Sequence, residues 1–370
     1  MRKEHLHMTS KIIRDLPPTP ENNRNSEGAF TSLKDGGILF AYSRYGNQGG
    51  HDDAAADIYG MISSDNGESF GDPFLMFTHQ DVQADNVMSV SFLPMSNGDI
   101  GLFCLHKFDA DQCRLYLSRS EGDIKNWSTP ILCTPEEGYY VVNNDRIIRT
   151  STGRLLAPAA YHESTTQIDE NGQKKLISIA HGILMIYASD DDGHTWYKIA
   201  GDMTIPLSGG CTSGAQEPGL LQLTDGRLWC YVRTKAGRQY ETFSEDDGKT
   251  WGPLLPSWFT GPCSPLSTKR LRNGSILAVW NPIPLYNGRS ERPCGVWTGA
   301  RTPLVYAVST DEGQNWSEPI AIETDENSGY CYVAIHEAAD GGILLAYCAG
   351  GTIDGSTLNR LRIRKLFLNE

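Results

Sequence analysis

Ser189-Asp190-Asp191-Asp192-Gly193-His194-Thr195-Trp196 is the stretch of this 370-residue chain that decides its fold, because the chain repeats it. The shared pattern is S-x-D-x-G-x-x-W/F. Further copies run over Ser63–Phe70, Ser244–Trp251 and Ser309–Trp316, and an eroded copy runs over Ser118–Trp127. A turn that recurs along a chain marks a recurring supersecondary unit. The sequence therefore predicts an array of similar units.

A second repeat, between these turn boxes, predicts β-hairpins. In its first copy the β-rich run Gly28–Leu33 precedes the turn Asp35-Gly36, and the apolar run Ile38–Tyr42 follows it. X-Gly between β-rich runs is a strong hairpin signal. The other turns are Asn97-Gly98, Thr152-Gly153, Asp225-Gly226, Asn273-Gly274 and Asp340-Gly341. Six hairpins, each followed by a third strand and in most copies by a turn box, predict an all-β fold. We expect a six-bladed β-propeller with four-stranded antiparallel blades.

This array covers residues 1–370, so we expect a single domain. The segment His5 to Asp15 is expected to supply the outer strand of the last blade, beside Leu361 to Leu368. In the turn boxes, Ser and Asp should hydrogen-bond the backbone, Gly should take positive φ, and Trp should pack between sheets. The boxes are therefore predicted to be structural and to carry no chemistry.

Composition limits the classes of partner. A net charge of −13 and a pI near 5.2 argue against nucleic acid or an anionic membrane. No apolar run is long enough to span a membrane, and Met1 to Leu16 contains no signal-peptide core. The nine cysteines include no C-x-x-C pair, which predicts reduced core thiols and no zinc site. We expect a cytoplasmic protein without metal or cofactor, and the oligomeric state stays open.

A propeller brings the starts of its inner strands and the ends of its second strands to one mouth of the central channel. Candidate functional residues are therefore the polar side chains at these corresponding positions. They are Arg24, Glu27, Asn86, Asp145, Glu217 and Tyr332 near inner-strand starts, His106, His162 and Arg233 at second-strand ends, and Arg301 before a third strand. We expect substrate contacts among them.

The chain resembles the sialidase (neuraminidase) superfamily, six-bladed propellers whose turn boxes are called Asp boxes. Its segment from Gln216 is similar to a family stretch in which a glutamate precedes an Asp-Gly turn by eight residues and an arginine follows that glutamate by sixteen. Glu217 and Arg233 have this spacing, and Arg301 matches another family arginine. Tyr332, eight residues before Asp340, matches the family's nucleophilic tyrosine. The resemblance implies that Tyr332 is the nucleophile, Glu217 its base, and Arg233 and Arg301 clamps for a substrate carboxylate.

The chemistry explains why such residues belong together. Sialic acid carries a carboxylate on its anomeric carbon and would repel a carboxylate nucleophile, so sialidases are an exception to the two-carboxylate rule. Guanidinium groups bind a carboxylate through paired, charge-assisted hydrogen bonds. A separate carboxylic acid protonates the leaving oxygen.

The first blade departs from the family, whose Arg-Ile-Pro motif supplies a third arginine. Ser26 occupies that position and Glu27 follows it. Arg24, two residues earlier, points to the same face of a strand. Either Arg24 supplies the third guanidinium or the third clamp is absent, and Glu27 offers a carboxylate to a sugar hydroxyl.

The general acid is expected on the glycine-rich loop from Tyr45 to Asp57, as Asp53 or Asp52. Our first hypothesis is an exo-acting, retaining glycoside hydrolase that removes a terminal acidic sugar from an oligosaccharide or glycoconjugate. The second is a polysaccharide lyase acting on a uronic acid, with Tyr332, His106 or His162 as base. The third is a non-catalytic propeller that binds glycan or protein.

Overall fold

The computed structural model describes residues 9–120, 123–168, 172 and 174–368, and in this part the chain is all-β. The helices described are the single 3-10 turns η1 (Gln80–Val82), η2 (Pro293–Gly295) and η3 (Thr357–Asn359). None of these three is long and apolar enough to cross a membrane. The predicted all-β class is confirmed for these residues.

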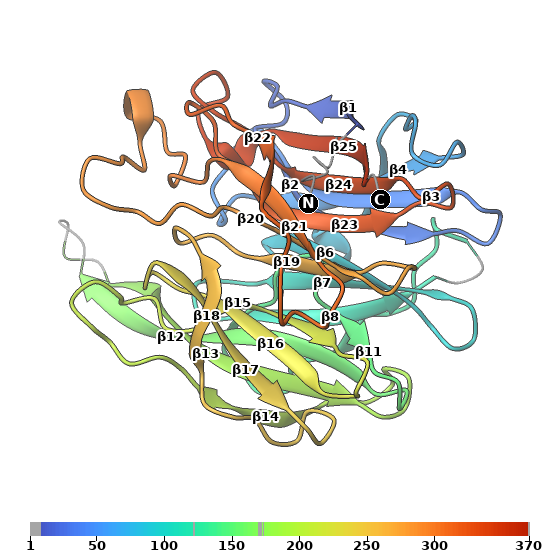
Figure 1. Cartoon of the computed structure of the whole chain (residues 1–370), viewed down its shortest axis with the longest axis horizontal. Coiled ribbons are helices and arrows are strands. Elements are labelled where there is room, and N and C mark those ends of the chain that lie inside the picture. Colours follow the sequence, from blue (N-terminus) through green and yellow to red (C-terminus); the bar gives the residue numbers. More distant parts are fainter. Residues whose placement is uncertain (1–8, 121–122, 169–171, 173, 369–370) are drawn as a thin grey trace, which may run out of the picture.

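Four sheets have four strands each (Figure 1). One contains β2 (Arg24–Ser32), β3 (Ile38–Tyr45), β4 (Ala56–Ser63) and β5 (Phe74–Phe77). Two more contain β15 (Gln216–Gln222), β16 (Leu228–Arg233), β17 (Arg238–Ser244) and β18 (Leu255–Thr260), then β19 (Ser267–Arg270), β20 (Ile276–Trp280), β21 (Leu304–Ser309) and β22 (Ile320–Glu323). The fourth joins the two ends of the chain through β1 (Thr9–Leu16), β25 (Leu361–Phe367), β24 (Ile343–Cys348) and β23 (Cys331–Glu337).

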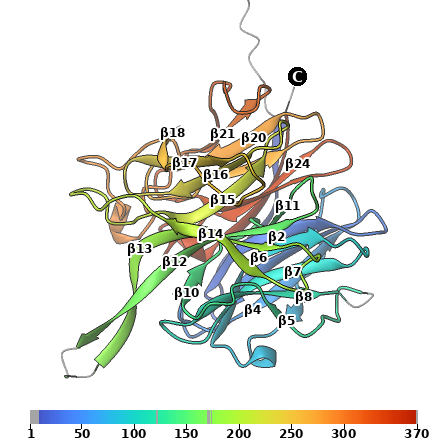
Figure 2. The ribbon, with the colours of Figure 1, turned by 90° about the horizontal axis from the view of Figure 1, so that it is seen from below.

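The remaining strands form one nine-stranded sheet. It contains β6 (Asn86–Pro94), β7 (Ile100–Lys107), β8 (Cys113–Arg119), β9 (Ile131–Leu132), β10 (Tyr139–Val141), β11 (Ile148–Arg149), β12 (Leu155–Ile168), β13 (Lys174–Ser189) and β14 (Tyr197–Met203). Two antiparallel groups meet where β10 pairs in parallel with β8, at Tyr139 and Cys113. The β12–β13 hairpin projects from the body of the molecule (Figure 2).

All six predicted hairpins are present, as β2–β3, β6–β7, β11–β12, β15–β16, β19–β20 and β23–β24. First strands of neighbouring hairpins contact one another: β2 contacts β6 and β23, and β19 contacts β15 and β23. The expected strand from the N-terminal segment is β1, which pairs with β25 over Thr9 to Leu16. The part of that prediction from His5 to Met8 lies outside the described residues.

The turn boxes form the hydrogen bonds predicted for them. The Ser189 hydroxyl donates to Asp191 at 2.8 Å and accepts from the Gly193 backbone N–H at 2.7 Å. Gly193 has φ of 88°, and the Trp196 indole N–H donates to its carbonyl at 3.1 Å. The full copies share the Ser-to-Asp bond, at Asp65, Asp246 and Asp311. These local bonds fix the turn because each replaces backbone hydration within a few residues.

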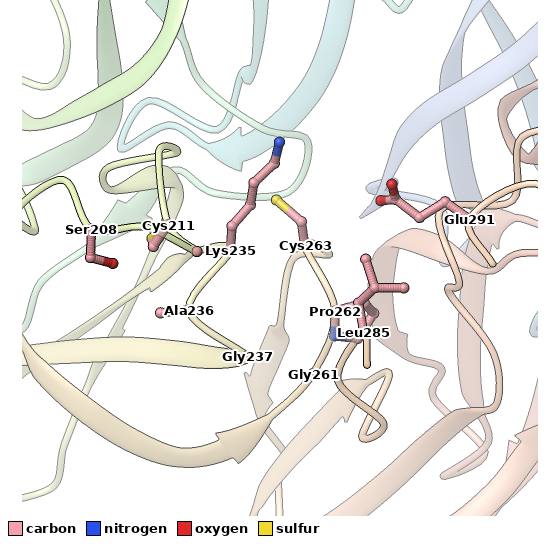
Figure 3. A pocket seen from close by; sticks show the side chains of 11 residues that line it. Ser208, Cys211, Lys235, Ala236, Gly237, Gly261, Pro262, Cys263, Leu285 and Glu291 are labelled. Atoms are coloured by element: carbon pink, nitrogen blue, oxygen red, sulfur yellow. The ribbon is translucent and has the colours of Figure 1, made fainter. Parts of the chain in front are cut away.

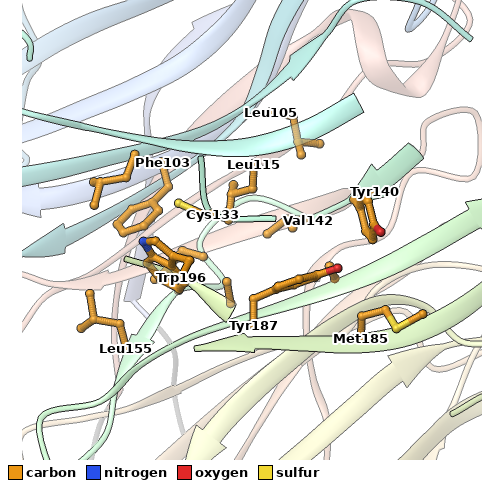
Figure 4. Close-up of a cluster of buried hydrophobic side chains, with 14 of the residues drawn as sticks. Phe103, Leu105, Leu115, Cys133, Tyr140, Val142, Leu155, Met185, Tyr187 and Trp196 are labelled. Carbon is orange, nitrogen blue, oxygen red and sulfur yellow. The ribbon is translucent and has the colours of Figure 1, made fainter. Parts of the chain in front are cut away.

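The tryptophans of the boxes pack between sheets, as predicted. Trp196 lies edge-on to Phe103, with ring centroids 6.0 Å apart, and contacts a cluster that includes Leu155 and Tyr187 (Figure 4). Phe103 comes from β7 and Tyr187 from β13, so one side chain joins the two antiparallel groups of the large sheet. Burial of such a ring stabilises the fold and supplies no side chain to the predicted channel mouth.

We predict that Trp196→Ala lowers the free energy of unfolding by about 3–5 kcal/mol, because it removes a buried ring and leaves a cavity. Urea denaturation followed by circular dichroism measures the change. Trp258, which is 55% exposed, provides the control: Trp258→Ala is expected to cost less than about half as much. Equal losses in the two variants would contradict the role given to the box tryptophan.

Candidate active site

Strand register brings the candidate residues to one end of the sheets. In four of the six hairpins the first residue of the first strand opposes the last residue of the second strand. Arg24 pairs with Tyr45, Asn86 with Lys107, Gln216 with Arg233, and Cys331 with Cys348. We call this end the mouth.

A β-bulge near the start of each of these first strands aims one side chain into the mouth. Register shifts occur after Ser26, Met88, Gln216 and Cys331. The residues that follow, Glu27, Ser89, Glu217 and Tyr332, have φ of 55°, 61°, 42° and 58°. Positive φ is unfavourable for a side chain, so these bulges store strain of about 1–3 kcal/mol each and re-aim the residue.

Glycine permits the bulge in two of the strands. A Cβ at Gly28 would lie 2.4 Å from the Phe40 ring, and one at Gly219 would lie 2.4 Å from the Tyr231 ring. The strands can therefore bend onto their neighbours only with glycine at these places. Gly28 directly follows Glu27, and Gly219 comes two residues after Glu217.

Tyr332, Glu217 and Arg233 form one hydrogen-bonded cluster. The Tyr332 hydroxyl donates to Glu217 Oε1 at 2.9 Å, inside the 2.6–3.2 Å range expected for a nucleophile and its base. Arg233 Nη1 donates to the same Oε1 at 2.6 Å and lies 3.5 Å from the Tyr332 hydroxyl. Glu217 Oε2 is buried and has no hydrogen-bond partner among the described residues. One carboxylate thus connects the phenol with a guanidinium, although 115 residues separate Glu217 from Tyr332.

Arg301 completes the cluster from the side of the tyrosine ring. Its guanidinium carbon lies 5.3 Å from the centre of the Tyr332 ring and 4.8 Å from that of Trp297. It donates to Cys331 Sγ at 2.9 Å and to the Cys263 carbonyl at 3.2 Å. Within the described residues Arg301 forms no ion pair and its buried Nε has no partner. A buried guanidinium without a carboxylate is suited to receive one from a ligand.

Electrostatics hold the phenol protonated and the carboxylate ionised. Burial raises the pKa of Tyr332 well above its ordinary value, and the neighbouring Glu217 charge raises it further. Burial alone would raise the pKa of Glu217, but the Arg233 guanidinium outweighs it and lowers that pKa. The resting cluster is therefore a neutral phenol that donates to a carboxylate.

Arg24 is committed to internal partners and does not face the mouth as a free clamp. It is 1% exposed and pairs with Glu27 at 2.6 Å and Asp52 at 2.5 Å. The other oxygen of Glu27 accepts from the Ser89 hydroxyl at 2.7 Å. These contacts occupy both side chains within the protein, and the roles of Arg24 as third guanidinium and of Glu27 as acceptor for a sugar hydroxyl stay predictions. The carboxylates of Glu27 and Asp52 already compensate the charge of Arg24.

The loop that carries the candidate acids is tied to the mouth by cations. Asp53 pairs with Lys107, whose ammonium also donates to the Asp52 carbonyl at 3.3 Å. Desolvation raises the pKa of Asp52, but the adjacent Arg24 outweighs it and holds the pKa below its usual value. Asn86, expected to contact substrate, is fully buried and donates to the Ala54 carbonyl at 2.6 Å. It holds the acid loop in place, and its substrate-binding role is a wrong prediction.

Asp145 and His162 have structural partners. Asp145 accepts from the Ile335 backbone N–H at 3.1 Å and lies 3.5 Å from Lys269. His162 lies within 2.7 Å of the Ile179 carbonyl, which fixes its Nδ1 as donor. Burial lowers the pKa of His162, and this effect outweighs the hydrogen bond to Ile179 and the charge of Glu217, which act to raise it.

His106 is the clearest correction, because it lies in the protein interior. It is 1% exposed, stacks on Tyr116 with centroids 4.2 Å apart, and lies 5.7 Å from Phe77. Successive side chains of a strand alternate between faces, and Lys107, the next residue, takes the position at the mouth. Sequence reasoning missed Lys107 and Ser89. Ser89 precedes Gly98 by nine residues, as Glu217 precedes Gly226 and Tyr332 precedes Gly341. This shared spacing could have identified Ser89.

The comparisons with known proteins agree with this architecture. The family of BNR repeat-like domains matches residues 48–345, and the chain belongs to this family within the sialidase/BNR-repeat superfamily. The anhydrosialidase of Macrobdella decora is 26% identical over 203 residues, which are 53% of this chain and 23% of that protein. The match thus spans about a quarter of that relative's length.

Two solved structures show the same fold. A protein of unknown function from Dyadobacter fermentans has a TM-score of 0.71 at 16% identity and covers 97% of this chain and 99% of its own. The intramolecular trans-sialidase of Ruminococcus gnavus has a TM-score of 0.66 at 15% identity, with 94% and 95% covered. At such identities the likeness establishes the fold alone.

Burial lowers the pKa of His106 to about 3, so the folded state keeps this imidazole neutral while the unfolded chain protonates it below about pH 6.5. The folded state therefore loses stability as pH falls from 6.5 toward 3. We predict that His106→Phe, which keeps the stacking, reduces the stability loss between pH 8 and pH 5 by about 2 kcal/mol. Urea titrations at both pH values measure it.

The exposed His51 supplies the control, and His51→Gln is expected to leave the loss unchanged. An unchanged pH dependence in His106→Phe would contradict a neutral, buried imidazole.

Proposed function

We propose that the chain forms one domain, a closed six-bladed β-propeller. The support is the six hairpins and the contacts of β2 with both β6 and β23, which bring the first and last units together. The pairing of β1 with β25 ties the two ends of the chain in one sheet, as a closing blade requires. Asn144 adds contacts across the centre, donating to the carbonyls of Gly28 at 2.7 Å and Tyr332 at 3.1 Å.

We propose that the protein is a retaining, exo-acting glycoside hydrolase of the sialidase type that removes a terminal acidic sugar from an oligosaccharide or glycoconjugate. The observation that carries the proposal is the 2.9 Å hydrogen bond from Tyr332 to Glu217 beside the uncompensated Arg301. A phenol joined to a carboxylate is a nucleophile with its base. A guanidinium without a carboxylate partner is the complement of an acidic substrate.

In the first step the Tyr332 oxygen attacks the anomeric carbon, the bond from that carbon to the leaving oxygen breaks, and Glu217 accepts the phenol proton. The raised pKa of Tyr332 keeps the phenol neutral at rest, so attack requires positive charge developing on the sugar. The glycosyl–tyrosine bond is then broken by water with a second inversion, which gives overall retention. Arg233 stabilises the charge on Glu217 before proton transfer and is free to turn toward substrate afterwards.

Two guanidinium groups, those of Arg301 and Arg233, are proposed to hold the substrate carboxylate. Arg24 is proposed to act indirectly: it holds Asp52 and thereby the loop that carries the acid. The names of the relatives from Macrobdella decora, an anhydrosialidase, and Ruminococcus gnavus, a trans-sialidase, point to sialic acid as the first sugar to test. Mass spectrometry of the product distinguishes hydrolysis, which adds water, from internal ring closure, which does not.

Asp53 is our proposed general acid. Asp52 pairs with the buried Arg24, which holds the pKa of this carboxyl below its usual value, whereas the Asp53 side chain is 74% exposed on a glycine-rich loop. Asp53 pairs with Lys107 in the resting structure, so we propose that substrate binding separates this pair before Asp53 donates its proton. A proton donor at this position would assist departure of the leaving oxygen.

We predict that Tyr332→Phe and Glu217→Gln each lower kcat on the aryl glycoside that the wild type cleaves by at least about 100-fold, because each removes a reacting group. A fluorescent aryl 2-α-sialoside, within a screen of aryl glycosides, provides the assay. Tyr286, which is 61% exposed, offers a matched control, and Tyr286→Phe should retain wild-type turnover. Unchanged kcat in both site variants would exclude this mechanism, and a wild type that cleaves none of the glycosides would leave a binding propeller.

The acid is tested through the leaving group. We predict that Asp53→Asn lowers turnover about 100-fold for an alkyl or sugar leaving group and much less for a nitrophenolate, which needs no proton. Asp52→Asn, the matched variant, should affect both leaving groups alike, because it loosens the loop. A larger dependence on leaving group in Asp52→Asn would assign the acid to Asp52.

A further inference from the structure

Two buried cysteines face each other beside Tyr332 and have no role in the chemistry described so far. Cys331 begins β23 and Cys348 ends β24, and the two residues are directly opposed in the antiparallel register. Directly opposed Cα atoms of antiparallel strands lie about 4.5–5.5 Å apart. A disulfide joins residues whose Cα atoms are about 4.4–6.8 Å apart, so the backbone already holds this pair at bridging distance.

A chain of hydrogen bonds runs through the two sulfurs and connects two arginines of the mouth. Arg24 Nη2 donates to the Ser26 hydroxyl at 3.2 Å, and this hydroxyl lies 3.2 Å from Cys348 Sγ. On the other side of the pair, Arg301 Nη1 donates to Cys331 Sγ at 2.9 Å. A covalent change at either sulfur therefore alters the hydrogen bonds that position these guanidinium groups.

Electrostatics distinguish the two sulfurs. Burial alone would raise the pKa of Cys331, but the Cys348 thiol and the Arg301 guanidinium outweigh it and lower that pKa. Burial raises the pKa of Cys348 well above its ordinary value. A thiolate is the form of cysteine that attacks an oxidant, and a neighbouring thiol then converts the product to a disulfide. The pair thus has the asymmetry of a reacting and a resolving cysteine.

A cavity of about 520 Å³ brings a small molecule close to this pair (Figure 3). Cys263 lines the cavity, and the Cys263 carbonyl accepts from Arg301 at 3.2 Å. One guanidinium group therefore joins the wall of the cavity to Cys331 Sγ. Cys331 and Cys348 are only 1% and 0% exposed, so an oxidant that reaches them must be small.

We propose that Cys331 and Cys348 form a site of reversible oxidation, which a peroxide converts to a disulfide. The Cys331 thiolate attacks one oxygen of hydrogen peroxide, the O–O bond breaks, and the hydroxide that leaves combines with the proton released by the thiol. The Cys348 sulfur then attacks the sulfenic sulfur of Cys331, the S–O bond breaks, and the hydroxyl group leaves with the Cys348 proton as water. Two electrons pass from the sulfurs to the peroxide, and a dithiol reductant reverses the change.

The disulfide acts on the proposed carboxylate clamp. Formation of the S–S bond moves Cys331 Sγ from Arg301 toward Cys348, and Arg301 loses a hydrogen bond that holds it against the Tyr332 ring. This effect on activity rests on the proposed glycoside hydrolase function, whereas the oxidation site itself does not.

Mass spectrometry tests the site without any substrate. The reduced protein is treated with hydrogen peroxide, its remaining thiols are alkylated after unfolding, and the digest is searched for cross-linked peptides. We expect a disulfide between Cys331 and Cys348 that dithiothreitol removes. Cys104 and Cys133 are the matched control, because burial raises the pKa of both, and they should stay thiols. A disulfide from Cys331 to Cys263, or no cross-link at Cys331, would overturn the assignment.

Turnover tests the consequence. We expect the disulfide to lower kcat/KM at least about tenfold for the glycoside that the wild type cleaves, because it displaces a substrate-positioning group, and dithiothreitol to restore it. The double variant Cys331→Ser, Cys348→Ser keeps a hydroxyl at each position and cannot form the bond, so peroxide should not change its activity.

Unchanged kcat/KM in the cross-linked wild type, or an equal loss in the double variant, would overturn the link between the disulfide and activity. A wild type that forms the disulfide but cleaves no glycoside would overturn the proposed function and leave the oxidation site in place.

Discussion

The mouth depends on a backbone constraint, a non-glycine residue held at positive φ near the start of a first strand. In a regular strand the side chains of Glu217 and Tyr332 would follow the alternation of the sheet and point into the layers between sheets. The bulge breaks that alternation for one residue and aims it along the strand axis. The strain of about 1–3 kcal/mol at each position is offset by the packed sheets around it. Function therefore rests on a local conformation that only the assembled fold can maintain.

Charge is distributed unevenly around this mouth. Arg24 has two carboxylate partners, Arg233 has one, and Arg301 has none among the described residues. The most compensated arginine belongs to the first sheet, where the family motif is replaced, and the least compensated lies against the Tyr332 ring. Arg301 forms no ion pair among the described residues, so an anionic ligand would meet less competition there than at Arg24 or Arg233, although the charge of Glu217 also acts on it.

Hairpins and turn boxes could be predicted because their determinants are local. The Ser189-to-Asp191 bond spans two residues, and an X-Gly turn sets hairpin register without help from distant segments. The eroded copy shows the limit of this approach. There Ser120 still bridges to Trp127, while Asp123 caps the N–H groups of Lys125 and Asn126 at 2.7 and 3.0 Å. The turn persists with a different set of bonds, which pattern matching cannot anticipate.

The sequence by itself determined the all-β class, the six hairpins and the structural turn boxes, since each follows from spacing relative to a turn. The pairing of Tyr332 with Glu217 was implied by the resemblance to the sialidase superfamily. Only the tertiary structure decided the partners of the other charged groups. Arg24 forms an ion pair with Glu27 inside the protein. His106 and Lys107 lie on opposite faces of β7, with the lysine at the mouth. Spacing fixes where a residue lies along a strand. Its burial, its ionisation and the partner of its charge depend on side chains that arrive from other sheets, and no local pattern encodes those.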